Sequence, residues 1–140
     1  MKLRYIVLTT LYCLGLFWLS SGPAPIDVQE PFPGFDKILH ALLYAGLAAL
    51  VAVGMRRSGT VSPQWALVAI PIGFAALYGV SDEIHQAFVP TRTFDLVDIV
   101  ADGAGALGVL GVLHLFWMRR RPARTDAAQR NSSPLDGIHL

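Results

Sequence analysis

The sequence predicts an all-α membrane protein, a bundle of four transmembrane helices with both termini in the cytoplasm. Three observations lead to this fold. Of the 140 residues, 54% are hydrophobic and only 15% are charged, whereas about a quarter of the residues in a soluble domain are charged. Four apolar runs come close to the roughly 20 residues that a helix needs to cross a bilayer. Basic residues gather at alternate ends of these runs, which indicates one orientation of the chain.

The first run covers residues 3–20 and contains Cys13, the only cysteine. With a single cysteine, an intrachain disulfide is excluded. A cleaved signal peptide is the alternative to a span, because Lys2 and Arg4 precede the run and small residues occupy positions 20–22. We favour a span, since the apolar stretch is longer than most signal-peptide cores and cleavage would leave the termini on opposite sides of the membrane.

The other three runs cover residues 38–55, 65–88 and 96–118. Turn-forming residues separate all four runs: Gly22, Pro23, Pro25, Pro31, Pro33 and Gly34 in the first connection, Ser58, Gly59 and Pro63 in the second, and Pro90 in the third. Residues 1–118 therefore form one transmembrane domain, and we expect residues 119–140 to be a disordered, polar cytoplasmic tail.

Basic residues set the orientation. They lie before the first run, after the second and after the fourth, as Lys2, Arg4, Arg56, Arg57, Arg119, Arg120, Arg121 and Arg124. The positive-inside rule places all of these ends in the cytoplasm, so the other two loops are extracytoplasmic. The net charge of +1 and the absence of a basic surface with interleaved aromatic residues exclude nucleic acid as a partner.

Polar residues collect at the extracytoplasmic helix ends. They are Asp36, Lys37, His40 and Tyr44 at the start of the second helix, Tyr78, Asp82, Glu83, His85 and Gln86 at the end of the third, Arg92 in the following loop, and Asp95, Asp98 and Asp102 at the start of the fourth. Spacings of three and four put three sets on shared faces: Asp36, His40 and Tyr44 on the second helix, Tyr78, Asp82, His85 and Gln86 on the third, and Asp95, Asp98 and Asp102 on the fourth. A carboxylate at mid-bilayer costs about 2.5 to 3.5 kcal/mol, so these faces should point into the bundle. The small residues Ala101, Gly105 and Gly108 continue the aspartate stripe and should allow close helix packing.

The order of these motifs resembles the VanZ-like family of bacterial membrane proteins. The residues that carry the resemblance are Asp36-Lys37-Ile38-Leu39-His40 with Tyr44, then Tyr78 to Gln86 with Pro90 and Arg92, then Asp95, Asp98 and Asp102 with Gly105. The likeness covers roughly residues 5 to 117. It implies a multi-pass protein of the bacterial cytoplasmic (inner) membrane, from a family associated with teicoplanin resistance, and it implies no particular reaction.

Three functions fit the polar residues. The first is binding or transport of an anionic lipid-linked cell-wall precursor, with membrane lipids as the surroundings and His40, Tyr44, Gln86, Arg92 and Asp95 as ligand-binding residues. The second is a metal-dependent hydrolase or transferase acting on a phosphorylated lipid. The third is a structural or partner-binding protein, in which the polar groups only hold the helices together.

The enzyme hypothesis assigns chemistry to five residues, namely Asp82, Glu83, His85, Asp98 and Asp102. A divalent metal, zinc or manganese, would be held by His40, Asp82, His85, Asp98 and Asp102. Glu83 would then act as general base on a metal-bound water, and Arg92 would hold a phosphoryl oxygen. The spacing matches no known zinc signature such as H-E-x-x-H.

Overall fold

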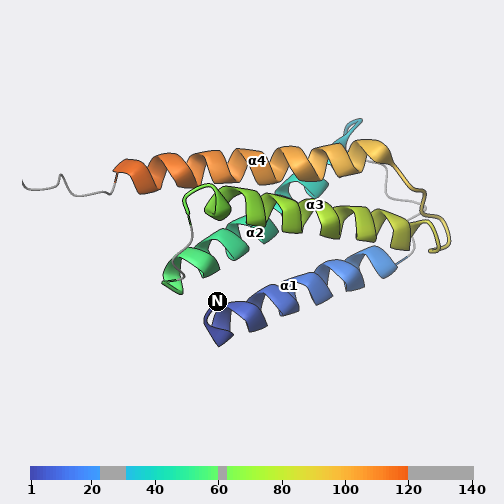
Figure 1. The fold of residues 1–140 in the computed structure, drawn as a ribbon. Coiled ribbons are helices and arrows are strands. Elements are labelled where there is room, and N and C mark those ends of the chain that lie inside the picture. Colours follow the sequence, from blue (N-terminus) through green and yellow to red (C-terminus); the bar gives the residue numbers. More distant parts are fainter. Residues whose placement is uncertain (23–30, 60–62, 120–140) are drawn as a thin grey trace, which may run out of the picture.

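The computed structural model of the chain describes residues 1–22, 31–59 and 63–119. These residues form four α-helices and no strand: α1 (Leu3–Ser21), α2 (Phe35–Arg57), α3 (Ala66–Gln86) and α4 (Leu96–Arg119) (Figure 1). All four are long and apolar enough to cross a membrane, which confirms the predicted fold class. The expected cytoplasmic tail lies outside the described residues, except for Arg119 at the end of α4.

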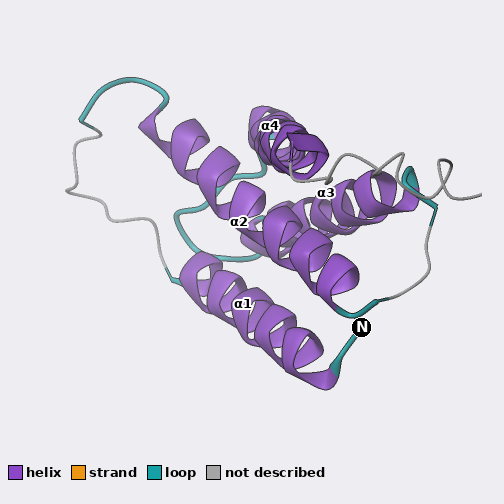
Figure 2. Cartoon of the chain, turned by 90° about the vertical axis from the view of Figure 1, so that its left-hand side faces the viewer, coloured by secondary structure: helices purple, strands orange, loops and turns teal. Residues whose placement is uncertain are grey.

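The bundle is organised around α2. Its most extensive interface is with α4, and α3 packs against both α2 and α4. In the described part of the chain α1 contacts α2 and α3 but not α4, and Figure 2 shows α2 running between α1 and α4. Helix α1 is therefore the peripheral member of the bundle.

Hydrogen bonds from two tyrosines attach α1 to its neighbours. The Tyr12 hydroxyl donates to the backbone oxygen of Leu43 in α2 at 2.9 Å, and the Tyr78 hydroxyl of α3 donates to the backbone oxygen of Cys13 at 2.6 Å. A Cβ atom at Gly46 would overlap the Tyr12 hydroxyl. The absence of a side chain at position 46 thus lets the Tyr12 ring lie against α2.

Helices α2 and α4 approach most closely at Gly105. A Cβ atom there would overlap the backbone of Ala41, whereas one at Gly108 would have nothing within 4 Å. The expectation of close packing is therefore met at Gly105 but not at Gly108, which is exposed. Small residues permit such backbone contact in membranes, where packing rather than the hydrophobic effect holds helices together.

Local signals position the ends of the helices that carry the polar residues. Gly34 precedes α2 with φ 85°, a left-handed conformation that glycine adopts without strain. Asp95 precedes α4, and its Oδ1 accepts a hydrogen bond from the Val97 backbone N–H at 2.8 Å, as a helix N-cap does. These two features fix where the first turns of α2 and α4 begin.

The start of α1, the end of α2 and the end of α4 lie at one end of the bundle (Figure 1). The Lys2 backbone N–H donates to the Ser58 hydroxyl at 2.7 Å, and the Arg56 guanidinium lies 4.3 Å from the centre of the Trp117 ring. We call this end, with Lys2, Arg4, Arg56, Arg57 and Arg119, the basic end. Its cytoplasmic orientation stays a prediction.

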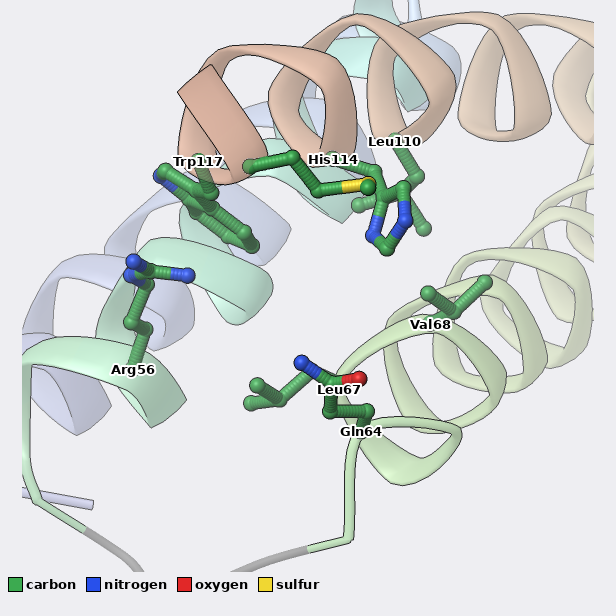
Figure 3. A pocket seen from close by; sticks show the side chains of 8 residues that line it. Arg56, Gln64, Leu67, Val68, Leu110, His114 and Trp117 are labelled. Atoms are coloured by element: carbon green, nitrogen blue, oxygen red, sulfur yellow. The ribbon is translucent and has the colours of Figure 1, made fainter. Parts of the chain in front are cut away.

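A small cavity of about 30 Å³ lies at the basic end between α2, α3 and α4. Figure 3 shows His114 pointing from α4 toward α3, with Arg56 and Trp117 at one side. A cavity of this size admits about one water molecule. His114 lines this cavity but is exposed, and it lies far along α4 from the carboxylates.

Candidate functional site

The polar residues of α2, α3 and α4 meet at the opposite end of the bundle, which we call the acidic end. It comprises the first turns of α2 and α4, the last turns of α3 and the loop between α3 and α4. Asp82, Glu83, Asp98 and Asp102 are all buried here. Buried carboxylates need positive partners or hydrogen-bond donors, so the surroundings of each one indicate what the site can bind.

Lys37 is the cation at the mouth of this site. Its Nζ lies 2.8 Å from Asp36, 2.5 Å from Asp95 and 2.8 Å from Asp98 Oδ1. Through these contacts Lys37 joins the beginnings of α2 and α4, a role that the sequence analysis does not assign to it.

His40 lies one turn deeper and also connects α2 with α4. Its Nδ1 is 3.1 Å from Asp102 Oδ1, and its Nε2 is 3.9 Å from Asp98 Oδ2. A Cβ atom at Gly79 would lie 2.5 Å from Asp102 Oδ2, so α3 leaves space for this carboxylate. The expected proximity of Asp102 and His40 inside the bundle is thus present.

Glu83 is fully buried between α3 and α4. One oxygen, Oε2, accepts a hydrogen bond from the Asp95 backbone N–H at 2.8 Å. Its Oε1 has no hydrogen-bond partner among residues 1–22, 31–59 and 63–119, and within these ranges the same is true of Asp102 Oδ2 and the Tyr44 hydroxyl. Three buried polar atoms without hydrogen-bond partners in the described residues lie close together here, which suggests that the site binds an additional group such as an ion or a ligand.

A cavity of about 280 Å³ opens beside this cluster, between α1, α2 and α3. One wall is apolar, with Leu16, Leu19, Leu39 and Leu43. The polar lining is provided by Ser20, Asp36, His40, Tyr44, Asp82, Gln86 and Arg92. The cavity is thus amphipathic, and His40 belongs both to its lining and to the carboxylate cluster.

Arg92 reaches the cavity from the loop after α3. Its backbone N–H donates to the Val89 oxygen at 3.1 Å, and its Nε donates to the Gly22 oxygen at 3.2 Å. The turn between them contains Thr91 with φ 69°, a value uncommon for a β-branched residue. This conformation turns the chain so that Arg92 faces α1 and the cavity.

His85 departs from the expected arrangement. Its Nε2 lies 3.0 Å from the Ser21 hydroxyl, and its ring centre is 4.5 Å from that of Phe17, so it faces α1. Asp82 accepts a hydrogen bond from Gln86 Nε2 at 3.2 Å and lines the cavity. Among the described residues, His40, Glu83 and Asp98 have potential metal-ligand atoms that all lie within 4.8 Å of one another. Two of these three, His40 and Asp98, are among the five expected metal ligands. The roles assigned to these residues stay predictions.

Asp95 lies directly before α4, outside the membrane-spanning helices. The hydrogen bond from Lys37, together with the one from the Val97 backbone N–H, lowers the pKa of its carboxyl group. Asp95 is therefore ionised at neutral pH and remains available to Lys37.

Comparison with known proteins gives one match. The VanZ/LLP1 family model matches residues 4–118. No curated protein and no solved structure matches the chain. The matched residues include all four helices except their outermost positions, and hence the whole acidic end.

Proposed function

Because the chain belongs to the VanZ/LLP1 family, we propose that this multi-pass membrane protein binds the polar end of an anionic, lipid-linked cell-envelope precursor at its acidic end. The observation that carries the proposal is the amphipathic cavity between α1, α2 and α3. Its volume of about 280 Å³ is near the lower limit of ligand pockets, which is about 300 Å³. That space suits a head group and the beginning of its chain.

The two walls of the cavity match the two parts of such a ligand. The leucines of α1 and α2 suit an isoprenoid or acyl chain, because their contact with it needs no polar partner. Arg92 and Gln86 supply donors for a phosphate or carboxylate, and a guanidinium binds such groups with two parallel hydrogen bonds. Since α1 is the peripheral helix, a lipid would enter from the membrane beside it.

The positive-inside rule places the basic end in the cytoplasm and this cavity at the extracytoplasmic face of the bacterial cytoplasmic membrane. Lipid-linked envelope precursors are used at that face. Because the family is associated with teicoplanin resistance, such binding would contribute to resistance to teicoplanin-type glycopeptides.

Native mass spectrometry tests the proposal. The full chain is incorporated into nanodiscs that contain a polyprenyl phosphate and phosphatidylglycerol in equal amounts, and the retained lipid is measured. We expect preferential retention of the polyprenyl phosphate and about a ten- to hundredfold weaker retention by Arg92→Gln, because hydrogen bonds to charged groups contribute roughly 1.5 to 3 kcal/mol. Arg56→Gln, at the basic end, is the matched control. Equal retention by both variants would contradict the proposal.

The metal-dependent hydrolase or transferase is the second candidate. It is favoured by the unpartnered Glu83 Oε1 beside His40 and Asp98, since metal-assisted attack on a phosphorylated lipid needs a cation and a base at the head group. A purely structural role is less well supported. Polar groups that only join helices gain by being satisfied, and buried oxygens without partners are costly.

A further inference from the structure

One residue from each of three helices contributes to a compact group at the acidic end. His40 of α2, Glu83 of α3 and Asp98 of α4 each offer one nitrogen or oxygen, and these atoms all lie within 4.8 Å of one another. Glu83 and Asp98 are buried and His40 is half-buried. Glu83 and Asp98 follow His40 by 43 and 58 positions in the chain, yet all three residues converge in the fold. Spacing in the sequence does not reveal this proximity.

Asp102 orients the imidazole of His40. With its proton on Nδ1, the ring donates to Asp102 Oδ1 at 3.1 Å, which leaves Nε2, 3.9 Å from Asp98 Oδ2, with a lone pair free for a metal ion. Metal-binding histidines commonly donate their other ring N–H to a carboxylate, which fixes the ring and makes the ligand nitrogen more basic. Asp102, itself almost fully buried, has this supporting position.

Glu83 supplies an observation independent of the cluster itself. Its side chain is fully buried, and its Oε1 has no hydrogen-bond partner in the described part of the chain. Each unsatisfied buried polar group in a native protein calls for a partner such as an ion. A cation among these three residues would provide one.

The charge of the group points to a divalent ion. If Glu83, Asp98 and Asp102 are all ionised, they bring three negative charges together, against the one positive charge of Lys37, which contacts Asp98. The remaining two negative charges would be balanced by one divalent cation. In addition, Lys37 is shared with Asp36 and Asp95, so it does not neutralise the deeper carboxylates fully.

We propose that a divalent transition metal binds between His40 Nε2, a Glu83 oxygen and Asp98 Oδ2, with Asp102 as the positioning residue of His40. One imidazole and two carboxylates suit zinc or manganese. Metal–ligand bonds of about 2.0 to 2.2 Å need ligand atoms roughly 3.4 Å apart. The ligand atoms, which lie within 4.8 Å of one another, would have to move closer together when the metal binds.

Three protein ligands leave a coordination position open, as in catalytic zinc sites. Because His40 also lines the amphipathic cavity, a phosphate oxygen bound there would be close to the metal. The metal would also remove the repulsion that so many carboxylates exert on an anionic ligand. The metal site itself does not depend on the lipid proposal.

Metal titration of the purified full-length chain tests the site. The protein is stripped with a chelator in detergent without added lipid, and Zn²⁺ and Mn²⁺ are titrated by calorimetry. We expect one ion per chain, with affinity at least a hundredfold weaker in His40→Asn and Glu83→Gln. Asp102→Asn should weaken it about ten- to hundredfold, as changes in residues that support metal ligands do. His114→Asn and Arg56→Gln, both at the basic end, are the matched controls and should bind like the wild type.

A second measurement keeps the test decisive if a variant fails to fold. In the wild-type protein, bound Mn²⁺ should show hyperfine coupling to one imidazole nitrogen by pulsed electron paramagnetic resonance. Absence of that coupling, absence of binding in the wild type, or equal loss in the control variants would overturn the proposal. Metal binding that persists in Arg92→Gln while lipid retention is lost separates this site from the lipid proposal.

Discussion

Replacement of Gly105 by alanine should separate α2 from α4. The new Cβ atom would lie 2.6 Å from the carbonyl carbon of Ala41 and 2.8 Å from its Cα. Ordinary van der Waals contact begins at 3.4 Å, so the carbonyl carbon must move away by at least 0.8 Å (3.4 minus 2.6), and the Ala41 carbonyl oxygen, which is closer still, by more. The obstacle is backbone, so a side-chain rotation cannot relieve it.

The expected cost follows from two opposing effects. Overpacking typically costs 1 to 3 kcal/mol, and a backbone obstacle favours the upper part of that range, about 3 kcal/mol. Alanine also stabilises a helix by about 1 kcal/mol relative to glycine. Gly108→Ala on the same helix should show only the gain in helix propensity, because nothing lies within 4 Å of a Cβ atom there. The difference between the two variants therefore isolates the overpacking cost. The two variants should therefore differ by about 3 kcal/mol, roughly a hundredfold in the unfolding equilibrium.

Reversible unfolding in mixed micelles of dodecylsulfate and a mild detergent, followed by tryptophan fluorescence, measures this difference. Gly105→Ala should also weaken the contact between His40 and Asp102, because position 105 is one turn from Asp102 and Ala41 is adjacent to His40. If Gly105→Ala and Gly108→Ala unfold alike, the close approach of α2 and α4 is refuted.

Three further predictions concern orientation and charge. Reporter fusions at Gly59 and Leu140 should read cytoplasmic and a fusion within residues 23–30 extracytoplasmic; a secreted C-terminus would contradict the orientation. A chelator should lower the melting midpoint of the wild type but not of Asp98→Asn, and an unchanged wild-type midpoint would count against a stabilising metal. Asp95 has a lowered pKa, so its contribution to stability is present above its ordinary pKa and is lost as the pH falls through the lowered value. Asp95→Asn should therefore destabilise the protein at pH 7, by an amount that shrinks as the pH falls below the ordinary carboxyl pKa. An effect that does not change with pH would contradict the pairing of Asp95 with Lys37.

Much of the fold follows from the sequence because a bilayer restricts the possible structures. Apolar length, turn residues and charge bias are sufficient to locate four spanning helices, and the observed bounds differ from the expected ones by a few residues. The exception at the start of α2, which begins at Phe35 rather than at residue 38, has a physical reason. Asp36 and Lys37 are polar but helical, so hydropathy places the start of the run too late.

The site is only partly predictable because helical spacing gives the face of a residue without giving its neighbour. Spacing groups His85 with Asp82, yet His85 faces α1 and Glu83 faces α4. The rotation of α3 relative to α2 and α4 decides this, and it depends on contacts such as that of Gly79 with Asp102. The sequence signal for the role of Lys37 is its position one turn before His40 on the same helix. A side chain there lies at the depth of the carboxylates that begin α4.

The attachment of α1 has an evolutionary consequence. Both tyrosine hydroxyls bond to backbone oxygens, which every amino acid possesses, so positions 13 and 43 can change without loss of either bond. Positions 12 and 46 cannot change independently, because a side chain at 46 would displace the Tyr12 hydroxyl. Among natural variants of this protein, a larger residue at 46 should therefore occur together with a shorter residue at 12.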